Sequence, residues 1–161
     1  SKAVERMLNE AKWLKILNKK NIGPKLLFHG DNYLVYKFVE GEFILDWMRK
    51  NDKEDIKKVI LNVLEQCFVM DQLNVNNEEM HHPLKHILVG ENNKVTLIDF
   101  ERCYKTDKPH NVTQFIDFIC RIKKELKSKI IVVVVEKLRK LAKEYKESYR
   151  RDDFNEILKN L

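Results

Sequence analysis

The fold of this chain is decided over residues 80–102, by the stretch MHHPLKHILVGENNKVTLIDFER. Its two apolar runs, residues 87–89 and 95–98, are typical of short β-strands joined by a polar hairpin turn. The second strand delivers one acidic residue, Asp99, to a strand end, while the histidines and the lysine of residues 81–86 reach the other side of the same hairpin. Such a hairpin is able to hold a metal-bound polyphosphate.

The length and composition of the chain bound the kind of protein it can be. With 161 residues, of which 43% are hydrophobic, it fits one domain with a substantial core. Charged residues make up 35% and are mixed in sign, which is a globular rather than a disordered composition. The net charge of +6 permits binding to RNA or to another acidic partner. Because the lysines are scattered along most of the expected helices, an ordinary solvated surface explains the same charge.

Cysteine use and hydropathy indicate the compartment. Cys67, Cys103 and Cys120 are odd in number and widely spaced, which implies neither a disulfide framework nor a set of metal ligands. We therefore expect a reducing, cytoplasmic environment. The longest apolar run, residues 130–135, has six residues. Because roughly 20 are needed to span a bilayer, we expect no membrane association.

The spacing of apolar residues predicts the order of helices and strands. The expected helices are Ala3–Asn18, Phe43–Arg49, Asp52–Leu73, Thr113–Lys127, Lys129–Tyr149 and Asp152–Leu161. Outside the hairpin, the expected strands are Leu26–His29 and Tyr33–Val39, and the expected loops include Asn74–Glu79 and Tyr104–Asn111. Residues 130–135 are ambiguous, because β-branched side chains favour a strand whereas the flanking Lys, Glu and Leu pattern favours a helix, which we prefer. This order predicts an α+β fold with few strands and one large helical portion.

Four segments in this order resemble one known family. They are Asn9–Leu14, Ile22–Leu27, Tyr33–Gly41 and the hairpin Ile87–Glu101. Together they resemble the atypical protein kinases, in particular the small, mainly archaeal, predicted serine/threonine kinases related to the RIO and lipopolysaccharide kinases. The resemblance covers roughly residues 5–122.

The resemblance implies a protein-kinase-like α+β fold. Residues 1–40 would form a truncated N-lobe of one helix and two or three strands, and residues 41–161 a mostly helical C-lobe that carries the catalytic and metal-binding hairpin. The implied activity is transfer of a phosphoryl group from ATP, with Mg²⁺, to a serine or threonine of a protein substrate. In such reactions the protein mainly positions the reactants and offsets charge.

The same resemblance implies roles for individual residues. Glu10 resembles the helix glutamate that pairs with the phosphate-binding lysine, and an ordinary exposed glutamate is the alternative. Asp99 resembles the metal-binding aspartate of the Asp-Phe-Gly motif, and the alternative is a strand-end aspartate that caps nearby backbone. The backbone of the hinge would receive the adenine, and the hinge residues are Phe38, Val39, Glu40 and Gly41.

The catalytic loop departs from the family pattern, because no aspartate occupies the position of the base. Aligned without gaps, His86 falls where the metal-binding asparagine belongs and His81 where the base belongs. Aligned with a gap, Pro83 falls at the base position, and the nearby carboxylates of Glu78 or Glu79 would have to act in its place.

Other polar residues of this region allow more than one interpretation. The histidines of residues 81–86 could share a zinc ion, but we prefer imidazoles that hydrogen-bond in a loop and help to hold a phosphate. Lys85 either offsets phosphate charge or lies on the surface. Glu101 replaces the glycine of the motif and either adds a metal ligand or pairs with Arg102. Asp117 stands where an aspartate braces the catalytic loop in the family.

Nothing before Glu10 matches the glycine-rich loop or the lysine-bearing strand of the family. We therefore expect either a fragment that lacks these strands or an abbreviated domain. A second hypothesis is a pseudokinase-type scaffold that holds an acidic partner or RNA on its basic face. The missing base and the missing lysine strand favour this second hypothesis.

Overall fold

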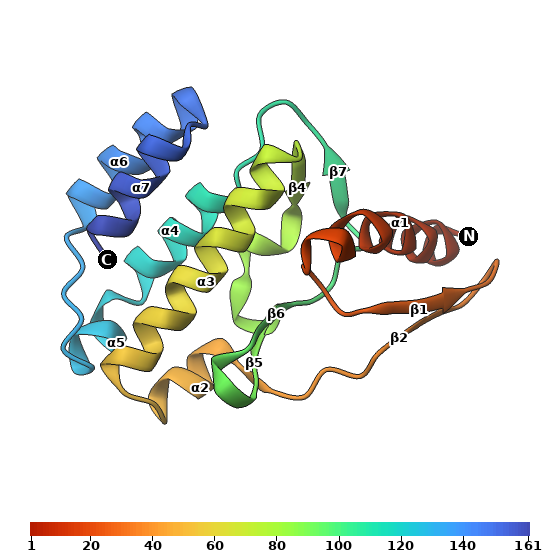
Figure 1. Ribbon diagram of the computed structural model, residues 1–161, viewed down its shortest axis with the longest axis horizontal. Helices are drawn as coiled ribbons and strands as arrows, with labels where there is room; N and C mark the ends of the chain where they lie inside the picture. Colours follow the sequence, from red (N-terminus) through yellow and green to blue (C-terminus); the bar gives the residue numbers. More distant parts are fainter.

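Helices dominate the structure because apolar side chains recur at helical spacing over most of the chain. The computed structural model describes all 161 residues, Ser1 to Leu161, and its architecture is α+β, as the sequence predicts (Figure 1). The helices are α1 (Lys2–Leu17), α2 (Ile44–Arg49), α3 (Lys53–Gln72), α4 (Asn111–Arg121), α5 (Lys123–Ser128), α6 (Val135–Ser148) and α7 (Arg151–Lys159). The strands are β1 (Leu26–His29), β2 (Leu34–Tyr36), β3 (Glu42–Phe43), β4 (Val75–Asn77), β5 (Ile87–Val89), β6 (Val95–Leu97) and β7 (Cys103–Lys105). None of these helices combines the length and the hydropathy that crossing a bilayer requires.

The strands form three small antiparallel sheets. β1 pairs with β2, β4 pairs with β7, and β5 lies between β3 and β6. The predicted hairpin is confirmed as β5–β6, in which Ile87 lies opposite Leu97. Two residues of its turn, Asn92 and Asn93, have positive φ, a conformation that asparagine adopts more readily than most residues.

Two parts of the chain share one apolar core. In Figure 1, α1 and the β1–β2 hairpin lie at the right and the helices α3 to α7 at the left, with the linker between β2 and β3 joining them. The buried face of α1 contributes Trp13, Leu14 and Leu17 to the same cluster as the buried side chains of α3 and α4. This cluster contains 37 residues and runs through both parts, so the boundary expected at residue 40 does not separate two cores.

Two segments that the sequence analysis assigns to loops form a sheet instead. Residues 75–77 are strand β4, and they pair with β7, residues 103–105. All three residues of β4 are buried although two of them are asparagines. Their side chains are satisfied by protein backbone, because Asn76 accepts the N–H of His110 and Asn77 accepts the N–H of Glu79. Hydropathy does not detect such a strand.

The helix expected from residue 129 begins later, at Val135. Ile131 is buried whereas Val132 and Val134 are exposed, which is the alternation of an extended segment. β-branched side chains lose rotamer freedom in a helix, and this cost outweighs the helical pattern on either side. The prediction of a helix over residues 130–134 is therefore wrong. The helix expected over residues 113–127 is also divided, into α4 and α5.

A buried network of polar side chains joins α3 to β4, α4 and α6. Asp71 accepts hydrogen bonds from the backbone N–H and the side-chain amide of Asn111, at 3.1 and 2.8 Å, and from the Tyr145 hydroxyl at 2.8 Å. Asn111 accepts the N–H of Asn77 at 2.9 Å and donates to the carbonyl of Val75 at 2.7 Å. Because these asparagines and Asp71 are at most 2% exposed, each of their polar groups needs its protein partner.

The carboxyl group of this network makes the stability depend on pH. Burial raises the pKa of Asp71 from 3.8 to about 6, although the hydrogen bonds from Tyr145 and Asn111 act in the opposite direction. The folded state therefore holds this proton more tightly than the unfolded chain does, and the contribution of Asp71 to stability is fully present only below the unfolded pKa. The free energy of unfolding falls by about 3 kcal/mol as the pH rises through the folded pKa.

We expect Asp71→Asn to remove this loss. The difference in free energy of unfolding, variant minus wild type, should increase by about 3 kcal/mol between about pH 4 and about pH 7. The wild type loses stability over this range, whereas the amide of the variant does not titrate. Urea denaturation followed by circular dichroism at several pH values measures the difference. Asp117→Asn, the same change at an exposed position of α4, is the control and should run parallel to the wild type. A parallel profile for Asp71→Asn as well would contradict the raised pKa.

Candidate functional site

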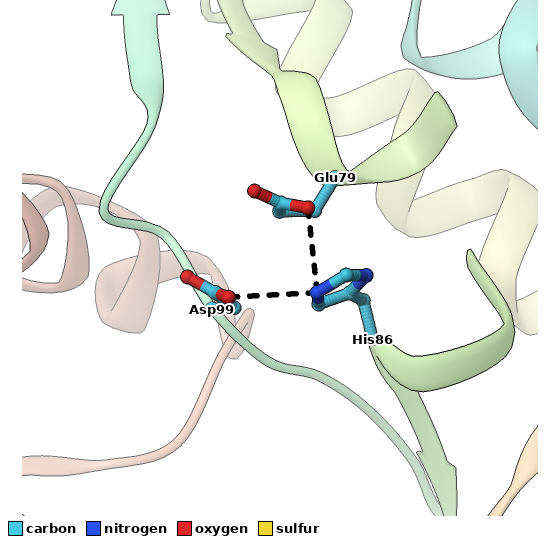
Figure 2. Close-up of side chains that lie close together, drawn as sticks. All are labelled: Glu79, His86 and Asp99. Carbon is cyan, nitrogen blue, oxygen red and sulfur yellow. Dashed lines mark ion pairs between the residues drawn. The ribbon is translucent and has the colours of Figure 1, made fainter. Parts of the chain in front are cut away.

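Three ionisable side chains from separate elements meet beside the β5–β6 hairpin (Figure 2). Glu79 lies in the 3₁₀ turn after β4, His86 immediately precedes β5, and Asp99 follows β6. The Nε2 atom of His86 is 3.3 Å from Oε2 of Glu79 and 3.4 Å from Oδ2 of Asp99. One potential ligand atom from each residue lies within 4.8 Å of the others. The Glu79–His86–Asp99 cluster is therefore a candidate metal site.

Backbone hydrogen bonds position the three residues of the cluster. The side-chain amide of Asn77 supports two of them, because its Oδ1 accepts the N–H of Glu79 at 3.0 Å and its Nδ2 donates to the carbonyl of Asp99 at 3.5 Å. The carbonyl of His86 accepts the N–H of Ile98 at 2.9 Å, which holds the start of β5 against the segment before Asp99. Since Asn77 belongs to the buried network, that network continues into the cluster.

Glu79 is the buried member of the cluster. Its side chain is 5% exposed, and its Oε1 accepts a hydrogen bond from Nε of Arg102 at 2.6 Å. Burial raises the pKa of Glu79, but the hydrogen bond from Arg102 and the charges of His86, Arg102 and His82 together outweigh burial, so the pKa lies below its ordinary value. Glu79 is therefore a carboxylate at neutral pH, and its second oxygen, Oε2, faces His86.

Helix α1 holds the segment that carries Asp99. The carboxylate of Glu10 accepts the N–H of Phe100 at 2.8 Å. The adjacent Asn9 donates to two carbonyls within residues 101–103, each at 2.9 Å. Sequence reasoning selected Glu10 but missed Asn9, whose role depends on a contact between segments about ninety positions apart.

The surroundings of the cluster carry an excess of carboxylates. Burial raises the pKa of Glu10, and the charges of Asp99 and Glu101 raise it further. Of the nearby guanidinium groups, Arg102 is bound inside the cluster and Arg6 lies 3.9 Å from Glu101. The alternative in which Arg102 pairs with Glu101 is therefore wrong, because the buried carboxylate of the cluster takes that guanidinium instead.

The other residues predicted to be catalytic lie outside the cluster. The ring of His81 packs against the ring of His82, with centroids 5.3 Å apart, and its carbonyl accepts a bond from Arg121. Lys85 is exposed on the surface. The three histidines do not converge as a zinc site would require, since His86 alone joins the two carboxylates.

The predicted hinge borders a separate cleft. All four of its residues, Phe38, Val39, Glu40 and Gly41, line a cleft of about 1490 Å³. None of the three cluster residues lines this cleft. Val89, the last residue of β5, does line the cleft, and it lies three residues beyond His86, about 10 Å away at the usual rise of a strand. The structure brings the candidate metal ligands together but does not join them to the hinge in one cavity.

Sequence reasoning also missed the residue that holds strand β4 in place, Asn111. Asn111 holds strand β4 through Asn77 and Val75, whereas the side chain of Asp117 is exposed on α4. The bracing role that the resemblance implies for Asp117 stays a prediction. An asparagine at the start of a helix is an ordinary capping pattern, so nothing in the sequence sets Asn111 apart. Its importance follows from its contact with Asp71, 40 positions earlier.

The donor set suits a divalent cation, but it does not fit Mg²⁺ well. The carboxylate oxygens of Glu79 and Asp99 are the kind of ligand that Mg²⁺ prefers, whereas imidazole nitrogen suits the transition metals. Because Nε2 of His86 faces both oxygens, it would be a ligand to any ion bound between them. The Mg²⁺ expected from the sequence stays a prediction.

Comparisons with known proteins leave the family open. Neither a scan against models of known protein families nor a search of curated proteins finds a match for this chain. The resemblance to atypical protein kinases and the ATP-dependent activity that it implies therefore stay predictions.

We expect Arg102→Gln to raise the pKa of Glu79, because the variant leaves a buried carboxylate without its guanidinium partner. The stability that this carboxylate contributes above its unfolded pKa would shrink accordingly. Carbon-13 NMR of the Glu79 carboxyl group during a pH titration measures the pKa. Arg6→Gln is the matched control, because Arg6 faces Glu101 and not Glu79. An unchanged Glu79 titration in Arg102→Gln would contradict this account.

Proposed function

We propose that this chain is a kinase-like domain that binds a nucleoside triphosphate with a divalent cation and transfers its terminal phosphoryl group to a serine or threonine hydroxyl. In this reaction the bond between the terminal phosphorus and the bridging oxygen breaks, a bond to the hydroxyl oxygen forms, and the hydroxyl proton passes to water. The serine or threonine acceptor is taken from the family resemblance. The Glu79–His86–Asp99 cluster supports the cation contact, and the linker of residues 38–41 supports the nucleotide contact.

The observation that carries the proposal is the contact between α1 and the segment after β6. Glu10 accepts the N–H of Phe100, directly beside Asp99, and Asp99 faces His86. Glu10, His86 and Asp99 are three of the positions to which the family resemblance assigns a role. Their meeting across about ninety positions of sequence supports a kinase-like reading of the chain.

The linker of residues 38–41 supports a nucleotide contact in a second way. No backbone hydrogen bond within the protein involves these four residues, and the last bonded N–H before them is that of Lys37, at 2.8 Å from the carbonyl of Lys25. Free backbone donors and acceptors beside a cleft can bind the polar edge of a base. A substitution at Gly41 would disturb this linker, since a Cβ there would lie 2.9 Å from the carbonyl oxygen of Val89.

The roles of the cluster residues in the proposed reaction are positional and electrostatic. Phosphoryl transfer needs little covalent chemistry from the protein, and its rate depends mainly on holding the reactants and offsetting charge. A bound divalent cation would neutralise the triphosphate. Asp99 and His86 would hold that cation, while Glu10 keeps the backbone of Phe100 in place and so orients Asp99.

We expect ATP with a divalent cation to stabilise the wild type, by about 2.7 kcal/mol when the nucleotide is at about 100 times its dissociation constant. Asp99→Asn should weaken this binding more than Glu10→Gln does, because Asp99 would contact the cation directly and Glu10 acts through backbone. Thermal unfolding and isothermal titration calorimetry measure the two effects. Asp117→Asn, an exposed carboxylate of α4, is the control and should bind as the wild type does.

Two outcomes would count against the proposal. The first is that ATP with the cation produces neither heat of binding nor a change in melting temperature. The second is that Asp99→Asn and Glu10→Gln lose equal affinity, which would remove the distinction between a cation ligand and a positioning residue.

A binding module is the second candidate function, and the position of the predicted bases favours it. His81 lies outside the cluster, and the carboxylate of Glu79 is engaged by Arg102.

If the domain binds RNA through its net positive charge, the logarithm of the binding constant should fall linearly with the logarithm of salt concentration. Fluorescence anisotropy with a single-stranded RNA measures this slope. A flat salt profile would remove RNA binding, and Asp99→Asn should leave the slope unchanged.

A further inference from the structure

The orientation of the His86 ring creates an electrostatic conflict inside the cluster. Nδ1 of His86 is 2.7 Å from the carbonyl oxygen of His82. A carbonyl oxygen only accepts, so Nδ1 must carry the hydrogen of this bond. In the neutral ring Nε2 then presents a lone pair, and it points at the carboxylate oxygens of Glu79 and Asp99. Three acceptors converge, and either a hydrogen on Nε2 or a cation must lie among them.

Two of the three spacings among these acceptors match the coordination shell of a metal ion. Divalent metals bind nitrogen and oxygen at about 2.0–2.2 Å, which places neighbouring ligands of a tetrahedron or octahedron about 3.0–3.5 Å apart. Nε2 of His86 is 3.3 and 3.4 Å from the two carboxylate oxygens. Both distances have the length of an edge of a coordination polyhedron, and both are longer than charge-assisted hydrogen bonds, which are about 2.7–2.9 Å. The ligand atoms of Glu79 and Asp99 lie within 4.8 Å of each other.

Charge and access also favour a cation. Arg102 balances only one of the two carboxylates, and Glu10 and Glu101 add further negative charge beside Asp99. Asp99 is 36% exposed and His86 is 18% exposed, so the open side of the cluster can admit an ion and its remaining water or phosphate ligands. The buried Glu79 forms the closed side.

We propose that Glu79, His86 and Asp99 bind a first-row divalent transition metal in preference to Mg²⁺. The preference follows from the imidazole, because Mg²⁺ selects oxygen ligands whereas Mn²⁺ and its heavier neighbours accept nitrogen together with carboxylate. The inference rests on the proposed function, since it names the cation of the same site. It is nevertheless tested without nucleotide.

Mn²⁺ is the probe, and its electron paramagnetic resonance spectrum is the readout. The sharp signal of free Mn²⁺ should decrease when wild-type protein is added without nucleotide. Zn²⁺ should displace the bound Mn²⁺ at lower concentration than Mg²⁺ does, in keeping with the order of transition-metal affinities. Electron spin echo modulation of the bound Mn²⁺ should show coupling to a directly bound nitrogen.

Two matched variants identify that nitrogen. His86→Asn replaces the ring nitrogen by an amide oxygen, which should remove the nitrogen coupling and lower Mn²⁺ affinity about tenfold, since changes even one shell further out cost 10–100-fold. His29→Asn makes the same change on an imidazole of β1, outside the cluster, and should keep both the coupling and the affinity. Asp99→Asn should also weaken Mn²⁺ binding, and circular dichroism checks that each variant is folded.

The outcomes separate this inference from the proposed function. Three results would each overturn the inference. They are absence of Mn²⁺ binding, displacement of Mn²⁺ by Mg²⁺ at the same concentration as by Zn²⁺, and nitrogen coupling that persists in His86→Asn. Mn²⁺ affinity that is unchanged in both His86→Asn and Asp99→Asn would overturn it as well, because the ion would then bind elsewhere. If Mn²⁺ binds as described but ATP does not, the proposed function fails and the metal site stands.

Discussion

The hydrogen bonds that Asp71 accepts from Asn111 are the constraint on which the rest of the structure depends. A buried carboxylate is tolerated only when its oxygens are satisfied, and Asn111 satisfies one while also binding the strand β4. Removing either partner would leave several buried polar groups without a bond, at a cost of about 1–3 kcal/mol for each. Because Asn77 connects this network to Glu79 and Asp99, the position of the candidate metal ligands depends on a core interaction far from solvent.

The part of the site that could be predicted from the sequence is the part that lies close together along the chain. Two short apolar runs mark the β5–β6 hairpin, and a hairpin brings the residues at its open end together, so the sequence could pair His86 with Asp99. Glu79 was placed in the loop as a candidate base, but its bond to Arg102 depends on how a 3₁₀ turn folds over the hairpin. No periodic pattern encodes that contact.

The errors in the secondary structure have physical causes of the same kind. Strand β4 is polar in sequence, and it is a strand only because buried asparagine side chains find backbone partners in other segments. The apolar run at residues 130–135 was assigned to a helix from its flanks, whereas the β-branched side chains themselves decide the local backbone. In both cases tertiary or side-chain effects override the hydropathy pattern from which the prediction was made.

The contacts of α1 have a mechanical consequence. Asn9 and Glu10 hold residues 100–103 by three hydrogen bonds, and the linker that connects α1 and its hairpin to the helical part has no backbone bonds of its own. A shift of α1 relative to the helices would therefore either break these bonds or drag Asp99 away from His86. The position of α1 therefore sets the distance between Asp99 and His86. A partner that binds the outer surface of α1 and displaces the helix would change this distance without touching either residue.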